Sequence, residues 1–206
     1  HTFMVHTGEI LGKINFTTPL KNSTLEQKVA RIKFNSPIGL AAGFDYEARL
    51  TQILPAIGFG FETVGTITNS PYGGNPRPML GRLPKSKSLM VNKGFKNLGA
   101  VETIKKLENL NFKFPLGISI GRTNTKNLVT QKQNVEDIIS AFKLFEKSKV
   151  KHFYYELNIS CPNLYGNISF YPTKNLDELL TAIDKLKIKR PVFIKMPIEK
   201  TNIETL

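Results

Sequence analysis

The residues best suited to chemistry gather in the stretch ELNISCPN, residues 156–163, around the single cysteine of the chain, Cys161. An apolar run leads into this stretch and a proline follows the thiol, which predicts that Cys161 lies just past the end of a buried strand. Asn158 and Asn163 flank it, and each amide offers a donor and an acceptor without charge. A thiol between two amides suits proton transfer to or from a heterocycle that alternates C=O and N–H groups. The alternative interpretation of a lone cysteine is a small buried hydrophobe.

Covalent catalysis by a Cys/His pair is less favoured than proton transfer. The histidines are His1, His6 and His152, and none of them lies at an expected C-terminal strand end. A nucleophilic cysteine would need such a partner. The single cysteine also excludes an intrachain disulfide and a zinc site with four cysteine ligands. We therefore expect an acid–base role for the thiol and no metal site.

Other predicted strand ends carry residues that are suited to binding a ligand. In GLAAGFD, residues 39–45, Ala42 and Gly43 are small enough to let a planar ligand approach the backbone. The stretch lacks the G-x-G-x-x-G dinucleotide pattern, and tight helix–sheet packing is its other explanation. Thr66 in VGTIT offers a hydroxyl, although a strand-end threonine is more often structural. Lys195 is a charge inside the apolar VFIKMP strand, which predicts an anionic partner because a buried lysine rarely lacks one.

These groups need a scaffold of alternating strands and helices to bring them together. Apolar runs bounded by glycine predict strands at 37–44, 61–68, 115–121, 153–160 and 191–196. Helical spacing predicts helices at 47–58, 99–110, 134–148 and 176–186, the third opened by Asn134 as N-cap, and a Gly/Pro/Asn-rich loop occupies 69–88. Such alternation indicates a parallel sheet with helical cover, either doubly wound or a (β/α)8 barrel. In both architectures the site forms at the C-terminal ends of the strands.

The composition indicates one globular domain with a basic surface. The chain has 206 residues, 40% of them hydrophobic, and 29 Lys and Arg against 16 Asp and Glu give it a net charge of +13. A solvated lysine surface is the plainer explanation, and an anionic partner such as membrane lipid or nucleic acid is the alternative. We find no apolar run long enough to span a membrane and no signal-peptide pattern. Because the chain starts at His1 in mid-pattern, we expect a truncation upstream of it.

Seven motifs in a fixed order, between about residues 31 and 198, resemble those of the dihydroorotate dehydrogenase family, the FMN enzymes of pyrimidine biosynthesis. The motifs are NSPIGLAAGFD, LPAIGFGFETVGTIT, GGNPRPMLGRLP, NKGFKNLGA, PLGISIG, ELNISCPN and VFIKMP. Each piece is weak by itself, and the ordered set is specific. The VGTIT, GNPRP and RLP pieces are most similar to the quinone-using, membrane-associated class, whereas a cysteine at position 161 is typical of the soluble class.

The resemblance implies an α/β fold, the (β/α)8 TIM barrel, with FMN across its C-terminal mouth. The chain would then supply about five strands, with the C-terminal strands missing. Residues 1–30 would be the end of a helical membrane-association region, and residues 31–206 the N-terminal part of the barrel. The implied location is cytoplasmic, peripheral on the inner face of the cell membrane, with a quinone as acceptor and no nucleic-acid partner.

The resemblance also implies a reaction and the residues that carry it. Cys161 would remove the C5 proton of dihydroorotate while the C6 hydride passes to FMN, which gives orotate. The implied cofactor-binding residues are Ala42, Gly43, Tyr46, Thr66, Ser119, Asn158 and Lys195. The implied substrate-binding residues are Asn158, Asn163, Gly94, Phe95, Asn92 and Lys93.

Three positions depart from the family pattern. Tyr46 replaces a lysine, Val91 replaces a substrate-binding asparagine, and Ser119 replaces a flavin-contacting asparagine. Lys93 or Asn92 on the same loop as Val91 is expected to compensate. The alternatives are a related FMN barrel acting on another substrate, such as a tRNA-dihydrouridine synthase-like enzyme, and a catalytically inactive flavoprotein homologue. Because barrels bind phosphate after strands seven and eight, we expect this chain alone to bind FMN weakly or not at all.

Overall fold

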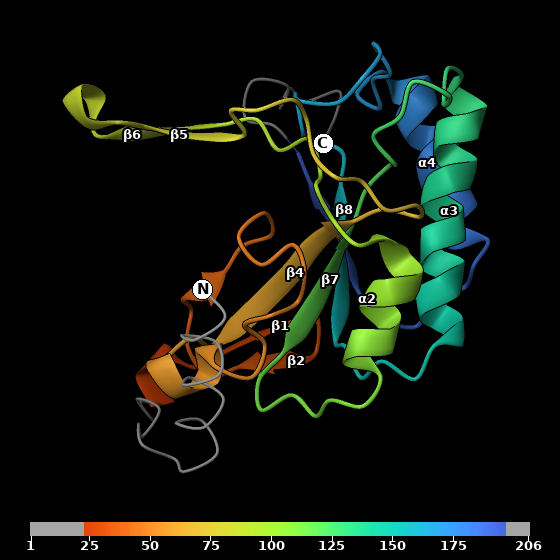
Figure 1. Ribbon diagram of the computed structural model, residues 1–206. Coiled ribbons are helices and arrows are strands. Elements are labelled where there is room, and N and C mark those ends of the chain that lie inside the picture. Colours follow the sequence, from red (N-terminus) through yellow and green to blue (C-terminus); the bar gives the residue numbers. More distant parts are fainter. Residues whose placement is uncertain (1–22, 197–206) are drawn as a thin grey trace.

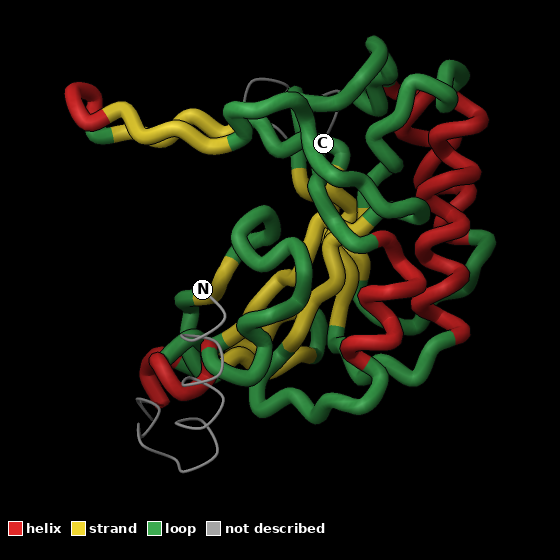
Figure 2. The backbone as a smooth tube through the Cα atoms, in the orientation of Figure 1, coloured by secondary structure: helices red, strands yellow, loops and turns green. Residues whose placement is uncertain are grey.

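The computed structural model describes residues 23–196 (Figures 1 and 2). Its centre is a five-stranded sheet in the order β3-β4-β7-β8-β9, in which every strand is parallel to its neighbours. The strands are β3 (Gly39–Leu40), β4 (Phe61–Ile67), β7 (Leu116–Ile120), β8 (Tyr154–Asn158) and β9 (Val192–Lys195). A doubly wound sheet reverses its strand order at a switch point, whereas barrel strands follow one another in sequence. The order observed here is therefore that of consecutive barrel units, a partial barrel as the resemblance implied.

Helices cover one face of this sheet. Figure 1 shows α2 (Gly99–Leu107), α3 (Gln131–Lys147) and α4 (Thr173–Asp184) together on one side. The main core lies between them and the sheet, where Ile118 of β7, Leu157 of β8 and Phe142 of α3 are fully buried. Because side chains alternate across a strand, the neighbouring residues of β7 and β8 face the other side, which is the inner face of the barrel.

An aromatic cluster fills the inner face near the N-terminal ends of the strands. The antiparallel hairpin of β1 (Gln27–Val29) and β2 (Ile32–Phe34) supplies Phe34, whose ring centroid lies 5.2 Å from that of Phe61. Tyr154 packs edge-on to Phe193 at 5.4 Å. Gly117 leaves room for Tyr154, since a Cβ on Gly117 would lie 2.1 Å from the tyrosine ring.

A second antiparallel hairpin extends away from the sheet. It consists of β5 (Leu80–Leu83) and β6 (Ser88–Val91), joined by the short 3₁₀ helix η3 (Pro84–Ser86), and Figure 1 shows it reaching out from the body. Most of it was predicted as loop. Its apolar side chains Leu80, Leu83, Leu89 and Val91 are exposed, so no buried face marks the strands in the sequence.

The sequence-based elements hold for four of the five strands and three of the four helices, within a few residues. The helix predicted at 47–58 is wrong. Turns and the 3₁₀ helix η2 (Leu54–Ile57) take its place, and Pro55 explains this because its ring blocks a preceding helical turn. The strand predicted at 37–44 shortens to the two residues of β3. A 3₁₀ turn, η1 (Ser23–Leu25), precedes β1.

The start of α3 also differs from its prediction. The N-cap is Thr130, whose hydroxyl accepts a hydrogen bond from the backbone of Gln133 in a capping box. Asn134 instead lies inside the first turn, where its amide donates to the carbonyl oxygens of Leu128 and Thr130. The expected membrane-association region falls largely on residues 1–22, outside the described residues. Between residues 23 and 196, no helix is both long enough and apolar enough to cross a membrane.

Candidate functional site

A cavity of about 250 Å³ lies at the C-terminal ends of the strands, where the loops after β3, β6 and β8 meet. Eleven of the predicted site residues line it: Ala42, Gly43, Tyr46, Thr66, Lys93, Gly94, Phe95, Asn158, Cys161, Asn163 and Lys195. Val91, Lys96, Ser160 and Pro162 complete the wall. Residues as far apart in the sequence as Ala42 and Lys195 therefore face one space.

The wall after β3 is made of backbone and small side chains. The N–H of Gly43 donates to the carbonyl oxygen of Gly65 at 2.7 Å, and the N–H of Gly65 donates to Asp45 at 3.2 Å. These bonds hold the segment alongside β4. Gly43 has φ +107°, and a Cβ built on it would meet nothing within 4 Å, so the wall faces open space there. Such a surface suits the face of a flat ring.

Beneath the cavity, hydroxyls connect the strands. The Asn158 Nδ2 donates to Thr66 Oγ1 at 2.7 Å, and Thr66 Oγ1 lies 3.0 Å from Ser119 Oγ. Ser119 in turn donates to a carboxylate oxygen of Glu156 at 2.7 Å. Ser119 is fully buried and does not line the cavity, so it supports Thr66 rather than facing a ligand.

The thiol of Cys161 is half-buried at the cavity. Burial raises its pKa, while the backbone N–H of Asn163 and the charges of Lys195 and Arg122 oppose that rise. Arg122 is itself buried and has one terminal nitrogen without a partner among the described residues. It lines an adjoining hollow of about 630 Å³ that shares Asn158, Cys161 and Lys195 with the cavity. The thiol is therefore a protonated group within reach of two cations.

The cavity carries positive charge on two sides. The ammonium of Lys93 lies 4.2 Å from the centre of the Tyr46 ring, and that of Lys96 lies 5.4 Å from it. Lys96 pairs with Glu47 at 3.9 Å, and Lys195 stands on the other side. Partial burial, then the charge of Lys96, lowers the pKa of Lys93. No carboxylate is among the described residues that line the cavity, so its occupant is expected to be anionic.

Asparagines fix the loops around the cavity. Asn75 donates to Asn92 Oδ1 at 2.8 Å, which draws Asn92 away from the cavity that it was predicted to line. Asn124 donates to the carbonyl oxygen of Gly94 at 3.0 Å, and Asn163 donates to that of Val91 at 3.1 Å. A Cβ on Gly94 would lie 2.5 Å from the Asn75 side chain, so only glycine leaves room for this arrangement.

Sequence reasoning gave no site role to three of these residues: Asn75, Asn124 and Glu156. Asn75 and Asn124 stand in Gly/Pro- or Thr-rich loops after strands, which is a signal that could have been used. Glu156 had a signal too, since a carboxylate inside an apolar strand is unusual.

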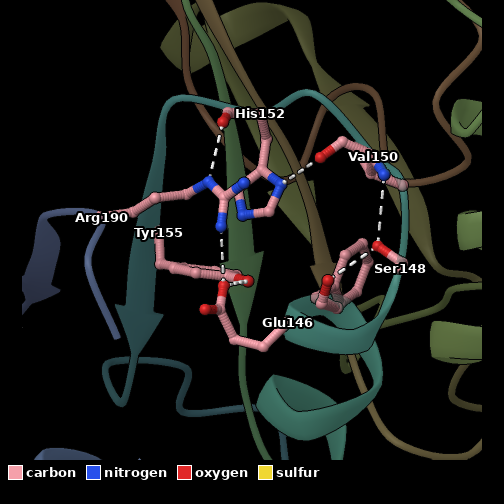
Figure 3. Close-up of polar contacts among 7 residues, drawn as sticks. Glu146, Ser148, Val150, His152, Tyr155 and Arg190 are labelled. Carbon is pink, nitrogen blue, oxygen red and sulfur yellow. Dashed lines mark hydrogen bonds and ion pairs between the residues drawn. The ribbon is translucent and has the colours of Figure 1, made fainter. Parts of the chain in front are cut away.

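The histidine among the described residues, His152, lies far from the cavity. His152 precedes β8, at the opposite end of the sheet, and its ring is buried against Tyr155 with 4.4 Å between centroids. Figure 3 shows Arg190 bridging the His152 carbonyl oxygen and the Glu146 carboxylate, at 3.0 and 2.9 Å. His152 is therefore no partner for Cys161, while His1 and His6 lie outside the described residues.

Comparisons with known proteins agree with the fold. The family model described as "Dihydroorotate dehydrogenase" matches residues 24–205. The dihydroorotate dehydrogenase (quinone) of Trichodesmium erythraeum is 32% identical over 187 residues, covering 88% of this chain and 48% of the relative. That of Chloroflexus aurantiacus is 36% identical over 172 residues, covering 82% of this chain and 46% of the relative.

Solved structures of Eimeria tenella DHODH are also similar. The complex with ferulenol aligns with a TM-score of 0.78 at 25% identity, covering 98% of this chain and 61% of that one. The ligand-free form aligns with a TM-score of 0.77 at 26% identity, covering 99% and 64%. The chain spans about half the length of the curated relatives that it matches.

Proposed function

The chain belongs to the dihydroorotate dehydrogenase family, and from that premise we propose that it oxidises dihydroorotate to orotate in pyrimidine biosynthesis. The single observation that carries the proposal is the cavity itself. One thiol, two asparagines and lysines on two sides line a single space at the C-terminal ends of the strands. That set matches a planar anionic ring that must lose a proton next to an acceptor of hydride.

The residues fit the ring system of FMN. The open backbone wall at Ala42 and Gly43 accommodates a flat face, and Thr66 offers a hydroxyl at its edge. None of the ion pairs between described residues involves Lys195, which leaves its ammonium for the anionic N1 edge of a flavin. When bound, FMN supplies the acceptor for the hydride that leaves C6 of the substrate.

The chain's own residues bind the substrate and move its proton. Asn158 and Asn163 hold the pyrimidine ring by its C=O and N–H groups. Cys161 takes the C5 proton onto its sulfur, so the thiolate is the active form. Lys195 and Arg122 favour that thiolate, because both positive charges act on the sulfur. Hydrogen bonds from Asn75, Asn124 and Asn163 hold the loop that carries Lys93 at the edge of the cavity.

The substrate carboxylate pairs with Lys93. Tyr46 cannot supply a charge, but its ring holds the Lys93 ammonium at the cavity wall, 4.2 Å away. Lys96 is less suited because Glu47 already pairs with it. Asn92, the other residue considered, makes a hydrogen bond to Asn75 instead. Lys93 therefore serves in place of the lysine that this family has at position 46.

We propose that a quinone is the final electron acceptor. The relatives that support this are named as quinone enzymes. The net charge of +13 suits peripheral attachment of the protein to the inner face of an anionic membrane.

The test is anaerobic flavin reduction. The gene's full reading frame is expressed, loaded with FMN and mixed with L-dihydroorotate, while the visible absorbance of the flavin is followed. We expect rapid bleaching that is lost in Cys161→Ala and partly retained in Cys161→Ser, which keeps a proton-accepting group. Flavin that binds and stays oxidised in the unaltered protein would reject the proposed reaction, and a substrate screen that includes tRNA would follow.

A further inference from the structure

The amide of Asn158 is held in one orientation. Its Oδ1 accepts two hydrogen bonds from Ser160, from the backbone N–H at 3.2 Å and from the hydroxyl at 2.9 Å. Its Nδ2 donates to Thr66 at 2.7 Å. A flipped amide would set its NH₂ group against the Ser160 N–H at one end and its oxygen against Thr66 at the other, so both ends oppose the flip. Asn158 therefore has one remaining N–H for an occupant of the cavity, and no free acceptor.

The hydrogen bonds below Asn158 run in one direction. Ser119 donates its proton to a carboxylate oxygen of Glu156, at 2.7 Å, and this bond fixes the direction of the others. Ser119 then accepts from Thr66, 3.0 Å away, and Thr66 is left to accept from Asn158. Ser119 and Thr66 are buried, which strengthens the bonds and removes competition from water. Each proton of the chain points toward Glu156.

Glu156 has no other described role. It lies in β8 on the inner face and forms no ion pair with another described residue. It is two residues from Asn158 and does not line the cavity. A carboxylate there is an unusual choice for an otherwise apolar strand. It accepts a hydrogen bond from the hydroxyl of Ser119, at the end of the chain of hydrogen bonds that begins at the cavity.

We propose that Glu156 is a positioning residue that sets the direction of this hydrogen-bond chain. As a result, Asn158 can bind only a hydrogen-bond acceptor of a ligand in the cavity. The proposal rests on the proposed function and deepens it. The atom that meets Asn158 is then a carbonyl oxygen or a deprotonated ring nitrogen. An analogue with an amino group at that place would set two donors against each other and leave both unpaired.

The experiment compares orotate with its two analogues in which an amino group replaces the C2 or the C4 carbonyl oxygen. The protein is expressed from the gene's full reading frame and loaded with FMN. Dissociation constants are measured from the change in its visible absorbance, and kcat and KM are measured for dihydroorotate. We expect the unaltered protein to prefer orotate over one analogue by about 100-fold or more. Glu156→Leu, of similar volume but without an acceptor, should reduce that preference at least about tenfold and raise KM more than it lowers kcat. Glu156→Gln keeps an acceptor oxygen and should hold the preference within about threefold.

A preference that is unchanged in Glu156→Leu, or reduced equally in both variants, would overturn the proposal. A second readout does not depend on catalysis or on orotate. The side-chain ¹⁵N–¹H₂ resonances of Asn158 in the ligand-free protein, assigned with Asn158→Asp, should move in Glu156→Leu and stay nearly in place in Glu156→Gln. Failure of the unaltered protein to bind orotate would reject the proposed function alone, while resonances that do not move in Glu156→Leu would reject the role of Glu156.

Discussion

At the scale of single residues, opposing effects act on the pKa of Cys161. Burial raises its pKa, and the charges of Lys195 and Arg122 act to lower it. Burial is the largest effect, so the thiol holds its proton at neutral pH and the thiolate fraction grows as pH rises. A base of this kind is inactive until it is deprotonated. We therefore expect the pH dependence of the proposed reaction to be set by the Cys161 sulfur and its charged neighbours.

The rate of flavin reduction should accordingly rise with pH through the neutral range and level off only above the pKa of Cys161. Arg122→Met removes a charge that favours the thiolate and should move this rise to higher pH. Lys126→Met, an exposed lysine in the same loop, is the matched control and should leave the profile in place. Flavin bleaching across a pH series measures the profile, and alkylation of Cys161 by iodoacetamide reports the thiolate independently. Coinciding profiles for the two variants would contradict the role of Arg122.

Lys93 gives a second prediction at the same scale. Lys93→Ala should weaken orotate binding about 10- to 100-fold, the range for loss of a hydrogen bond to a charged group. Lys96→Ala should have a much smaller effect, because Glu47 already pairs with Lys96. Tyr46→Phe keeps the ring and should behave like the unaltered protein, whereas Tyr46→Leu should weaken binding. Titration of each variant with orotate gives the ratio, and equal affinities for Lys93→Ala and Lys96→Ala would contradict the assignment.

At the scale of elements, β4 contains a carboxyl group that the fold buries away from solvent. Glu62 is fully buried, and its oxygens have no hydrogen-bond partner that the structure shows among residues 23–196. Burial, together with the charge of Asp45, raises its pKa from 4.5 to about 9. A group with a raised folded-state pKa stabilises the fold below its unfolded pKa, and that stability is lost as pH rises toward the folded value.

We expect Glu62→Gln to raise the free energy of unfolding at pH 7 by about 2–3 kcal/mol. The benefit should shrink at pH 5 and grow toward pH 9, because only the charged carboxylate is penalised by burial. Denaturant unfolding at several pH values measures it. Glu102→Gln, an exposed residue of α2, is the control and should show no such trend. A gain that is constant with pH would mean that ionisation of Glu62 is not its cause.

The junction between α3 and β8 has the opposite pH dependence. Burial lowers the pKa of His152 from 6.5 to about 3, with the charge of Arg190 adding to the effect. Below pH 6.5, His152 binds a proton in the unfolded chain but not in the folded chain. Stability should therefore fall by about 1.4 kcal/mol for each pH unit between 6.5 and 3 from this residue. His152→Phe should flatten that decline in acid unfolding curves, and an unchanged slope would count against this explanation.

Sequence patterns predicted the elements that bury an apolar face and failed on those that do not. β4, β7 and β8 are apolar runs and were found near their observed bounds. The β5–β6 hairpin has no buried face, so its sequence does not alternate between apolar and polar residues. β3 pairs with its neighbour over only two residues. The site followed a similar rule. Cys161 and its flanking amides were predicted because strand ends of a parallel sheet meet. Contacts such as Asn75 to Asn92 join loops without a local pattern and could not be predicted.

At the scale of the whole molecule, the described sheet has five strands, whereas a closed barrel has eight. The first and last strands, β3 and β9, each pair with one neighbour among the described residues. Phosphate in such barrels is bound by loops after the seventh and eighth strands. The described residues therefore supply the wall for a flavin ring without a strand-based site for its phosphate.

The 206-residue chain expressed by itself should accordingly hold much less than one FMN per chain. The measurement is the ratio of flavin absorbance to protein after removal of free FMN. Riboflavin, which lacks the phosphate, is the informative comparison and should bind about as weakly as FMN. Stoichiometric FMN in this chain, or a strong preference for FMN over riboflavin, would contradict the expectation.

The asparagines around the cavity have a consequence for the speed of exchange. The loop that carries Val91 and Gly94 is held by Asn75, Asn124 and Asn163 at once. Moving that loop aside would have to break these bonds together, so we expect opening to be concerted rather than gradual. In the proposed reaction, entry of substrate and departure of product should then share a single slow step. The rate of the proposed reaction should be limited by how often the loop opens, and removing one amide should speed release while shortening the time that a bound ring stays aligned.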